Sequence, residues 1–428
     1  MKILVIGSGA REHALTWKLA AEPGVDTVFC APGNPGIAQV AQLVPIAATD
    51  VDELLAFAQR EAIDLTVVGP EAPLERGLVD RFTAAGVRAF GPTRAAAQLE
   101  TSKAFAKDLM RRASVPTAGY RVVDTPAEAR EAARAFGGKV ALKADGLAAG
   151  KGVILASTED EASAAIDALM VERKVGDAGR VLVVEELLDG PEVSFFTLCD
   201  GERALPLASA QDHKRVFDDD RGPNTGGMGA FAPSPLMSAE LQARVMREIV
   251  EPTLAACREA GHPFRGFLYT GLMLTADGPK VIEFNVRFGD PEAQVVLPLI
   301  ASDLAPLLAA AADGRLADAT VTLSAQPHVG VVLASGGYPE RFETGKPIEG
   351  LDAVSDLRDV LVFHAGTRRQ ADGRIVSDGG RVLTVVGRGA DFAAAIAGAY
   401  DGVSRITFDG RHVRTDIGRK ALDAMRTR

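Results

Sequence analysis

The chain has 428 residues, of which 47% are hydrophobic and 24% are charged, with a formal net charge of −10. This length predicts about three domains of roughly 150 residues each. The negative charge argues against a nucleic-acid partner, because such proteins usually present a basic face. No apolar run reaches the about 18 residues of a membrane span. Cys30, Cys199 and Cys257 lack the spacing of a zinc site or a disulfide framework, which is typical of a reducing compartment. We therefore expect a cytoplasmic protein that binds neither membranes nor nucleic acid.

The first hundred residues alternate between short apolar runs and helical patterns. Near-continuous apolar strands joined by helices are typical of a parallel α/β sheet, which binds ligands at the carboxyl ends of its strands. The predicted strands are Ile3–Ile6, Val28–Cys30, Leu65–Val68 and Arg88–Phe90, with helices that end at Leu19 and Gln59 and one near Glu75–Ala85.

The turn Gly7-Ser-Gly9 follows the first predicted strand and invites comparison with a dinucleotide fingerprint. That fingerprint requires a third glycine where this chain has Glu12, and an acidic residue after the second strand, where this chain has Ala31-Pro32-Gly33. The pattern instead favours a small phosphate-bearing substrate at the helix N-terminus, with Arg11 as an added cation. A purely structural turn remains the alternative.

A glycine-rich turn between Lys143 and Gly152 is the first of two motifs that indicate nucleotide chemistry. Small residues let backbone N–H groups approach phosphate oxygens, and lysine neutralises their charge. The turn is not a Walker A motif, because no serine or threonine follows its last lysine. A surface lysine beside an ordinary loop is the alternative. The flanking small α/β segment is expected to have strands Tyr120–Val123, Val140–Lys143, Val153–Ala156 and Val181–Glu185 and helices Pro126–Phe136 and Glu159–Met170.

The second motif is the predicted strand Val281–Asn285. Alternation places Glu283 and Asn285 on one face and Ile282 on the other. Two oxygen ligands, completed by phosphates and water, suit a magnesium ion. Arg287 follows directly and could stabilise charge on a transferring phosphoryl group.

Two further stretches carry clustered polar groups. The strand end at Glu185–Leu188 could offer backbone groups to adenine and Glu192 could bind ribose, although an ordinary edge carboxylate is the alternative. The passage Gln211–Gly229 has no clear secondary structure, and passages of this length are usually functional or disordered. Its mixed charges, the acidic run Asp218–Asp220 and a glycine-rich anion nest suit a substrate with a carboxylate and an amine, although a solvated charge run stays open.

Taken in order, these motifs resemble the ATP-grasp superfamily and, within it, the phosphoribosylamine–glycine ligases (glycinamide ribonucleotide synthetases) of purine biosynthesis. One departure is Ala293, where threonine is expected. The resemblance covers nearly the whole chain and rests on Gly7–His13, Val68–Pro73, Lys143–Gly152, Gln211–Arg215, Pro223–Gly229 and Glu283–Glu292.

The resemblance implies an α/β fold in three parts: an N-terminal parallel-sheet, Rossmann-like domain (1–102), a central ATP-grasp domain (103–325) with a small mobile lid subdomain (about 117–190), and a C-terminal α/β domain (326–428). It implies an ATP-dependent ligase that joins glycine to 5-phosphoribosylamine through glycyl phosphate and uses Mg²⁺ or Mn²⁺. We expect a monomer. The rival interpretations are another ATP-grasp carboxylate ligase, such as a biotin-carboxylase-like enzyme, and a catalytically inactive nucleotide-binding protein.

The resemblance also assigns roles to residues. Arg287, Lys214 and Asp212 are expected at the reacting groups, and Glu283 and Asn285 at the metal. ATP is expected to contact Lys103, Lys143, Gly146, Gly150, Lys151, Gly152, Glu185, Glu186, Leu188 and Glu192. The other substrates are expected to contact Gly9, Arg11, Glu12, Glu71, Asp212, Lys214, Asn224, Thr225, Gly226, Arg287 and Asp290.

Overall fold

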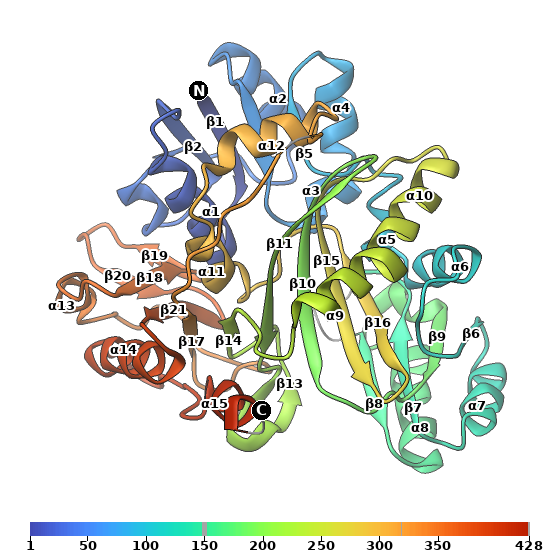
Figure 1. Ribbon diagram of the computed structural model, residues 1–428. Helices are drawn as coiled ribbons and strands as arrows, with labels where there is room; N and C mark the ends of the chain where they lie inside the picture. The colour runs from blue at the N-terminus through green and yellow to red at the C-terminus, as the bar shows by residue number, and fades with distance from the viewer. Residues whose placement is uncertain (148–151, 318, 427–428) are drawn as a thin grey trace.

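The computed structural model describes residues 1–147, 152–317 and 319–426 (Figure 1). Its N-terminal part is a five-stranded parallel sheet in the order β3-β2-β1-β4-β5. This confirms the parallel arrangement predicted from the apolar runs. The strands are β1 (Lys2–Gly7), β2 (Thr27–Pro32), β3 (Gln42–Leu43), β4 (Leu65–Val68) and β5 (Ala89–Phe90).

The first two helices end within one residue of their predicted ends, but a later predicted helix is divided into two. The helix expected near Glu75–Ala85 is interrupted at Gly77, whose φ of +78° lies in the left-handed region that favours glycine. The helical residues Gln98–Arg112 are interrupted at Ser102, which is extended and accepts a hydrogen bond from the N–H of Phe105. Ser102 therefore caps a new helix that begins at Lys103. The helices are α1 (Ala10–Ala20), α2 (Val51–Arg60), α3 (Glu71–Glu75), α4 (Leu78–Ala84), α5 (Gln98–Thr101) and α6 (Lys103–Arg112).

The small α/β segment forms a four-stranded antiparallel sheet in the order β6-β9-β7-β8. Its hydrophobic cluster draws only on residues between Val123 and Val184, so this segment has a core of its own. Lys143 and Glu185 alternate with the core residues and lie on the other face. The elements are β6 (Tyr120–Val123), α7 (Pro126–Ala135), β7 (Val140–Ala144), β8 (Val153–Ala156), α8 (Glu159–Ile166) and β9 (Leu182–Glu186).

A second, eight-stranded antiparallel sheet occupies the middle of the molecule, in the order β16-β15-β10-β11-β14-β17-β21-β18. It runs without a break across the domain boundary expected between residues 325 and 326, because β14 pairs with β17. Its strands are β10 (Glu192–Asp200), β11 (Ala204–Asp212), β14 (Gly229–Ala232), β15 (Arg265–Thr275), β16 (Gly278–Asn285), β17 (His328–Ala334), β18 (Val360–His364) and β21 (Arg381–Arg388).

The long passage without a predicted structure contains a hairpin. β12 (Arg215–Phe217) pairs with β13 (Arg221–Asn224), and a second two-stranded sheet joins β19 (Thr367–Arg369) to β20 (Ile375–Ser377). No helix in the described residues is long and apolar enough to span a membrane. The remaining helices are α9 (Ala239–Val245), α10 (Glu251–Glu259), α11 (Ala293–Val296), α12 (Leu304–Ala312), α13 (Leu351–Ser355), α14 (Phe392–Arg405) and α15 (Arg419–Arg426), with a π-helical turn joining α9 to α10.

One irregularity in β16 changes which residues face the core. Gly271 of β15 lies opposite Glu283, but the next residue, Leu272, lies opposite Val281, so β16 has one extra residue there. Val281 consequently packs in the same core as Phe284, whereas Ile282 does not join it. The prediction that Ile282 points into the opposite face was therefore wrong. The shared face of Glu283 and Asn285 lies beyond the bulge and is unaffected.

Candidate active site

The turn after β1 is shaped by a buried carboxylate. Glu12 accepts hydrogen bonds from the N–H of Gly9 at 2.7 Å and from Nε of Arg11 at 2.6 Å. A Cβ atom at Gly7, the last residue of β1, or at Gly69, directly after β4, would overlap the Glu12 side chain. The glycines at these strand ends therefore make room for Glu12, which fixes the N-terminus of α1 through a capping interaction.

This turn also contacts the segment that follows β16. Arg11 Nη1 donates to the carbonyl of Phe288 at 3.2 Å, and a Cβ atom on Gly9 would lie 3.6 Å from Asp290 Oδ2. Burial lowers the pKa of Arg11, but Glu12 and other nearby carboxylates outweigh it and raise the pKa above its usual value. The structure thus brings the predicted substrate residues Gly9, Arg11, Glu12 and Asp290 together.

Arg287 is the centre of a second cluster. Its Nη2 donates to Glu100 Oε1 at 2.6 Å and to Asn285 Oδ1 at 3.1 Å, and its Nε donates to Glu71 Oε2 at 3.2 Å. The other oxygen of Glu100 accepts the N–H of Val286 at 2.8 Å. Burial raises the pKa of Glu100 despite Arg287, whereas Arg287 and Arg11 overcome burial and lower the pKa of Glu71. Arg287 is therefore held in one orientation by three side chains.

Glu283 lies among cations without a fixed partner. Among the described residues, no hydrogen bond or ion pair holds its carboxylate. Burial raises the pKa of Glu283, but the nearby Lys214, Lys143 and Lys103 have the larger effect and lower it. The carboxylate is therefore ionised at neutral pH and free to bind a ligand. Asn285 Oδ1, on the same face of β16, is already an acceptor from Arg287.

Two lysines meet at Glu185. Lys143 Nζ forms an ion pair with Glu185 Oε1 at 2.9 Å, without the geometry of a hydrogen bond. The same Nζ donates a hydrogen bond to the carbonyl of Ile282 at 2.7 Å. Lys107 Nζ lies 2.9 Å from Glu185 Oε2 and donates to Thr117 Oγ1 at 2.7 Å. Burial lowers the pKa of Lys107 to about 8. The carboxylate of Glu185 is therefore bound to protein cations and is not free to contact a nucleotide.

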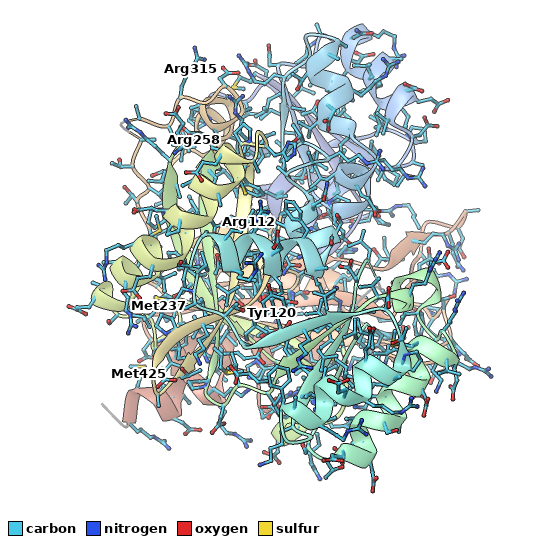
Figure 2. The ribbon with its side chains drawn as sticks, turned by 90° about the vertical axis from the view of Figure 1, so that its right-hand side faces the viewer. Arg112, Tyr120, Met237, Arg258, Arg315 and Met425 are labelled. Carbon is cyan, nitrogen blue, oxygen red and sulfur yellow. The ribbon has the colours of Figure 1, made fainter. Side chains whose placement is uncertain are left out.

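The position of Lys107 follows from the packing of α6 beside the small sheet. Figure 2 shows Arg112 at the end of α6 and Tyr120 at the start of β6, next to that helix. The Tyr120 hydroxyl donates to the carbonyl of Lys107 at 3.1 Å. This contact fixes the helix turn from which the lysine reaches Glu185.

The glycine-rich turn begins against the N-terminus of α6. Asp145 Oδ1 accepts the N–H of Ala104 at 3.1 Å, and Lys103 Nζ donates to the carbonyl of Gly146 at 3.2 Å. Burial lowers the pKa of Lys103, with Lys143 adding to the effect and Glu283 opposing it. Gly152 is described and buried. Gly150 and Lys151 lie outside the described residues.

The residues after β9 have free backbone groups, and not free carboxylates, for contact with a ligand. Glu186 Oε1 accepts the N–H of Gly119 at 2.9 Å, so this carboxylate is engaged within the protein. In the described part of the chain, neither the N–H nor the C=O of Leu188 has a hydrogen-bond partner. Of the predicted adenosine residues, Leu188 is the one whose backbone is available to a base edge.

Asp212 and Lys214 lie at the end of β11 with Glu192. Lys214 Nζ forms an ion pair with Glu192 Oε2. Burial lowers the pKa of Lys214, but Asp212 and Glu192 raise it well above its usual value, so the ammonium stays charged. Burial raises the pKa of Asp212 although Lys214 opposes it. The two predicted catalytic groups therefore form one coupled cluster, and Glu192 belongs to it.

Glu292 adds a carboxyl group to this cluster. The Ser194 hydroxyl lies 3.1 Å from both Glu292 Oε1 and the Tyr269 hydroxyl. Burial and the nearby Asp212 raise the pKa of Glu292 to about 7. This residue stands within a motif that the sequence singled out, yet no role was assigned to it.

The glycine-rich stretch after β13 is not an open anion nest, so that expectation was wrong. The N–H of Thr225 donates to the carbonyl of Lys214 at 2.7 Å, and the N–H of Gly226 donates to the Tyr338 hydroxyl at 3.0 Å. Gly227 and Met228 also donate within the protein. The successive N–H groups are therefore used to fix the loop itself.

Arg381 ties this loop to Asp290. Its Nη1 donates to the carbonyls of Gly226 and Asp290, each at 2.6 Å, and lies 3.4 Å from Asp290 Oδ1. Arg381 lies in β21, far along the chain from both partners. Arg381 therefore joins Gly226 to Asp290.

Comparison with known proteins agrees with this geometry along the whole chain. The chain matches models of the phosphoribosylglycinamide synthetase N domain (residues 1–100), ATP-grasp (A) domain (101–293) and C domain (328–420). It is 52% identical to the phosphoribosylamine–glycine ligase of Brucella melitensis over 99% of both chains. This chain belongs to the phosphoribosylglycinamide synthetase family.

The fold of this chain is similar to the folds of solved structures. The crystal structure of phosphoribosylamine–glycine ligase from Thermotoga maritima aligns with a TM-score of 0.86 and 33% identity, over 97% of this chain and 100% of the other. A biotin carboxylase–β-γ-ATP complex from Campylobacter jejuni aligns with a TM-score of 0.72 and 15% identity, over 96% of this chain and 92% of the other. The second likeness shows a shared fold alone. The predicted family and fold class are confirmed.

The sequence alone did not indicate several site residues whose partners are distant along the chain. Lys107 was overlooked because it stands one helical turn after Lys103 and meets Glu185 only in the fold. Helical spacing from Lys103 was the one available signal, since side chains four residues apart share a face. The other residues missed were Glu100, Glu292, Tyr338 and Arg381.

Proposed function

We infer that this chain is an ATP-dependent ligase that joins glycine to 5-phosphoribosylamine, giving glycinamide ribonucleotide, ADP and phosphate, in purine biosynthesis. The match to all three family domains carries this conclusion. The site supports it, because Lys143, Glu283 and Arg287 place cationic and anionic groups where a phosphoryl group would be transferred. The rival ligase and the inactive protein are not favoured, since relatives across the full length are phosphoribosylamine–glycine ligases.

The proposed chemistry has two steps. A carboxylate oxygen of glycine attacks the γ-phosphorus of ATP, the bond to the β-phosphate oxygen breaks, and ADP and glycyl phosphate form. The amine of 5-phosphoribosylamine then attacks the acyl carbon, phosphate leaves with the C–O bond electrons, and the amine releases one proton. Both steps require positioned charge but no covalent enzyme nucleophile.

We assign the ATP side to the wall formed by α6, the small sheet and the chain after β9. Lys103 and Lys143 neutralise phosphates, and Gly146 and Gly152 belong to the same nucleotide set. The free backbone groups of Leu188 contact the adenine edge. Glu185 acts indirectly, because its carboxylate holds Lys143 in place. The proposed nucleotide set also retains Glu186, Glu192, Gly150 and Lys151.

We propose that Glu283 and Asn285 hold Mg²⁺ or Mn²⁺. The donor set fits, since Glu283 is ionised and unpaired in the described residues and both residues supply the oxygen ligands that such ions prefer. No group of three or more metal-binding side chains of the His, Cys, Asp and Glu types occurs in the described residues, so phosphates and water would complete the shell. The bound ion supplies neutralisation of phosphate charge.

The other substrates are assigned to the opposite wall. Gly9, Arg11, Glu12 and Glu71 would line the site for phosphoribosylamine at the N-terminus of α1, where helix geometry favours phosphate. The glycine substrate would lie near Arg287 and Lys214, whose charges suit its carboxylate. The same subsite would include Asp212, Asn224, Thr225, Gly226 and Asp290.

We also propose the arrangement of the whole protein. The domains are 1–102, 103–325 with the lid subdomain at about 117–190, and 326–428. The separate core of the small sheet supports a lid that moves as a unit. We also propose that the protein is a monomer. Three buried cysteines without disulfides support a cytoplasmic location.

The function is tested by following ADP release with each substrate left out in turn. We expect release at the full rate only with ATP, glycine and 5-phosphoribosylamine together, and a product mass equal to glycinamide ribonucleotide. Alanine in place of glycine is the matched control, because it adds one methyl group next to the reacting carboxylate. Equal release with alanine, or without any amine acceptor, would contradict the assignment.

A further inference from the structure

The acidic run Asp218–Asp220 has no part in the proposed chemistry, yet each of its residues is bound. It forms the tip of the β12–β13 hairpin, and Figure 1 shows α15 and the end of the chain beside this hairpin. The N–H of Thr415 donates to Asp218 Oδ1 at 2.8 Å, and the N–H of Asp219 donates to Asp416 Oδ2 at 2.9 Å. The tip is therefore attached to the C-terminal segment by backbone and side-chain bonds.

Arg414 is the centre of this attachment, and its side chain is only 1% exposed. Its Nε and Nη2 donate to the two oxygens of Asp416 at 2.8 and 2.7 Å. Its Nη1 donates to Asp220 Oδ1 at 2.9 Å and to the carbonyl of Arg215 at 3.0 Å. One guanidinium thus joins the C-terminal segment, the hairpin tip and the first residue of β12.

The backbone of the tip needs such support. Asp219 has φ +57° and Asp220 has φ +52°, so two successive residues with side chains adopt the left-handed conformation. This conformation is uncommon for residues with side chains, and two in succession require surrounding contacts that fix them. The bonds from Arg414 and Asp416 supply those contacts.

The base of the same hairpin carries proposed substrate residues. Arg215 pairs with Asn224 across the hairpin, and the carbonyl of Lys214 accepts the N–H of Thr225 at 2.7 Å. Arg414 contacts the carbonyl of the residue directly after Lys214. A change in the hairpin tip or in this carbonyl therefore shifts Lys214 relative to Glu192.

We propose that Arg414 is a positioning residue for the glycine subsite: it fixes the β12–β13 hairpin and so sets the position of Lys214, Asn224 and Thr225. This inference rests on the proposed function, since it names the subsite that the hairpin serves. It predicts that loss of the Arg414 guanidinium contacts impairs the use of glycine. ATP binding should be unchanged, because the proposed ATP residues lie on the other wall of the site.

The test compares Arg414→Lys with Arg419→Lys in the full chain. A lysine keeps the charge of Arg414 but cannot reach Asp416, Asp220 and the Arg215 carbonyl together. Arg419 is the matched control, because its exposed side chain makes one ion pair with Asp219, 3.2 Å long. We expect Arg414→Lys to raise the KM for glycine about tenfold or more, on the scale of lost supporting contacts. The KM for ATP should stay within about twofold, and Arg419→Lys should change neither.

Hydrogen exchange of the backbone amides from Arg215 to Asn224 gives a readout independent of activity. It should be faster in Arg414→Lys than in Arg419→Lys. Should Arg414→Lys fail to fold, Asp220→Asn serves instead, because Asp220 is partly exposed and the change removes the negative charge that pairs with Arg414 and Lys420 without leaving a cavity. An unchanged glycine KM, an equal rise in both KM values, or unchanged exchange would each overturn the inference. Failure of the wild-type chain to require glycine would instead refute the proposed function.

Discussion

Glu100 and Glu71 both pair with Arg287, but the pKa of Glu100 is raised and the pKa of Glu71 is lowered. This difference allows the two carboxyl groups to be tested against each other. Glu100→Gln removes a charge-assisted hydrogen bond of 2.6 Å, worth about 1.5–3 kcal/mol. It also removes the burial penalty of an ionised carboxylate, which is on the order of several kcal/mol. The raised pKa of Glu100 shows that the penalty is the larger effect. We therefore expect the free energy of unfolding to change by less than about 1.5 kcal/mol near neutral pH.

Turnover should nevertheless fall in this variant. A glutamine at position 100 has one acceptor oxygen for two donors, Arg287 Nη2 and the N–H of Val286, so Arg287 keeps Glu71 and Asn285 but its shortest contact is weakened and its guanidinium is less well oriented. We expect turnover to fall about 10–100-fold, the scale seen when a supporting partner of a site residue is removed. The variant should thus be folded but slow.

The pH dependence of stability separates the two carboxylates. The folded-state pKa of Glu100 lies above its unfolded value, so its contribution is present below the unfolded pKa and is lost as pH rises through the folded pKa. The pKa of Glu71 is lowered, so its contribution is present above the unfolded pKa and is lost as pH falls. Glutamine does not titrate. Relative to wild type, Glu100→Gln should gain stability as pH rises above about 4.5, the ordinary pKa of Glu, whereas the stability lost in Glu71→Gln should shrink as pH falls below about 4.5.

Thermal unfolding of the three proteins below and above this pH, together with turnover at each pH, is the required measurement. The reasoning is refuted if both variants shift in the same direction with pH. It is also refuted if Glu100→Gln turns over as fast as wild type, because Arg287 would then not depend on Glu100.

Two further predictions concern the nucleotide side. Glu283→Gln should lower turnover about 100-fold or more, since it removes the anionic metal ligand while preserving shape. Glu259→Gln, at an exposed position on α10, is the control, and similar turnover of the two variants would contradict the metal assignment. Lys107→Met should weaken binding of an ATP analogue about tenfold and destabilise the fold by up to about 3–5 kcal/mol, because Glu185 loses one of its two cations. Calorimetric binding and thermal unfolding measure these effects, and unchanged affinity would show that Lys107 does not position Lys143.

Much of the fold could be predicted from sequence because local patterns determine it. The strands Leu65–Val68 and Tyr120–Val123 begin and end at the predicted residues, since apolar runs bounded by turns are a local signal. The same holds for the shared face of Glu283 and Asn285. The bulge at Ile282 could not be predicted, because it depends on pairing with β15 and not on the residues of β16 alone.

The parts that were missed depend on contacts between distant segments. The β12–β13 hairpin contains two left-handed aspartates, and the contacts that support them lie about 200 residues further along the chain. Glu100 was missed for the same reason, since it meets Arg287 only after β16 packs against α5. Side chains that position others leave no motif of their own.

The pairing of β14 with β17 limits how this protein can be dissected. A chain cut between 313 and 326 would separate β14 from β17, β21 and β18 and leave a row of backbone N–H and C=O groups at a new sheet edge. Such bare edges pair with other chains and promote aggregation. A truncated ATP-grasp fragment would therefore require its missing C-terminal strands, added in trans or mimicked by a peptide spanning β17, to remain a discrete folded species.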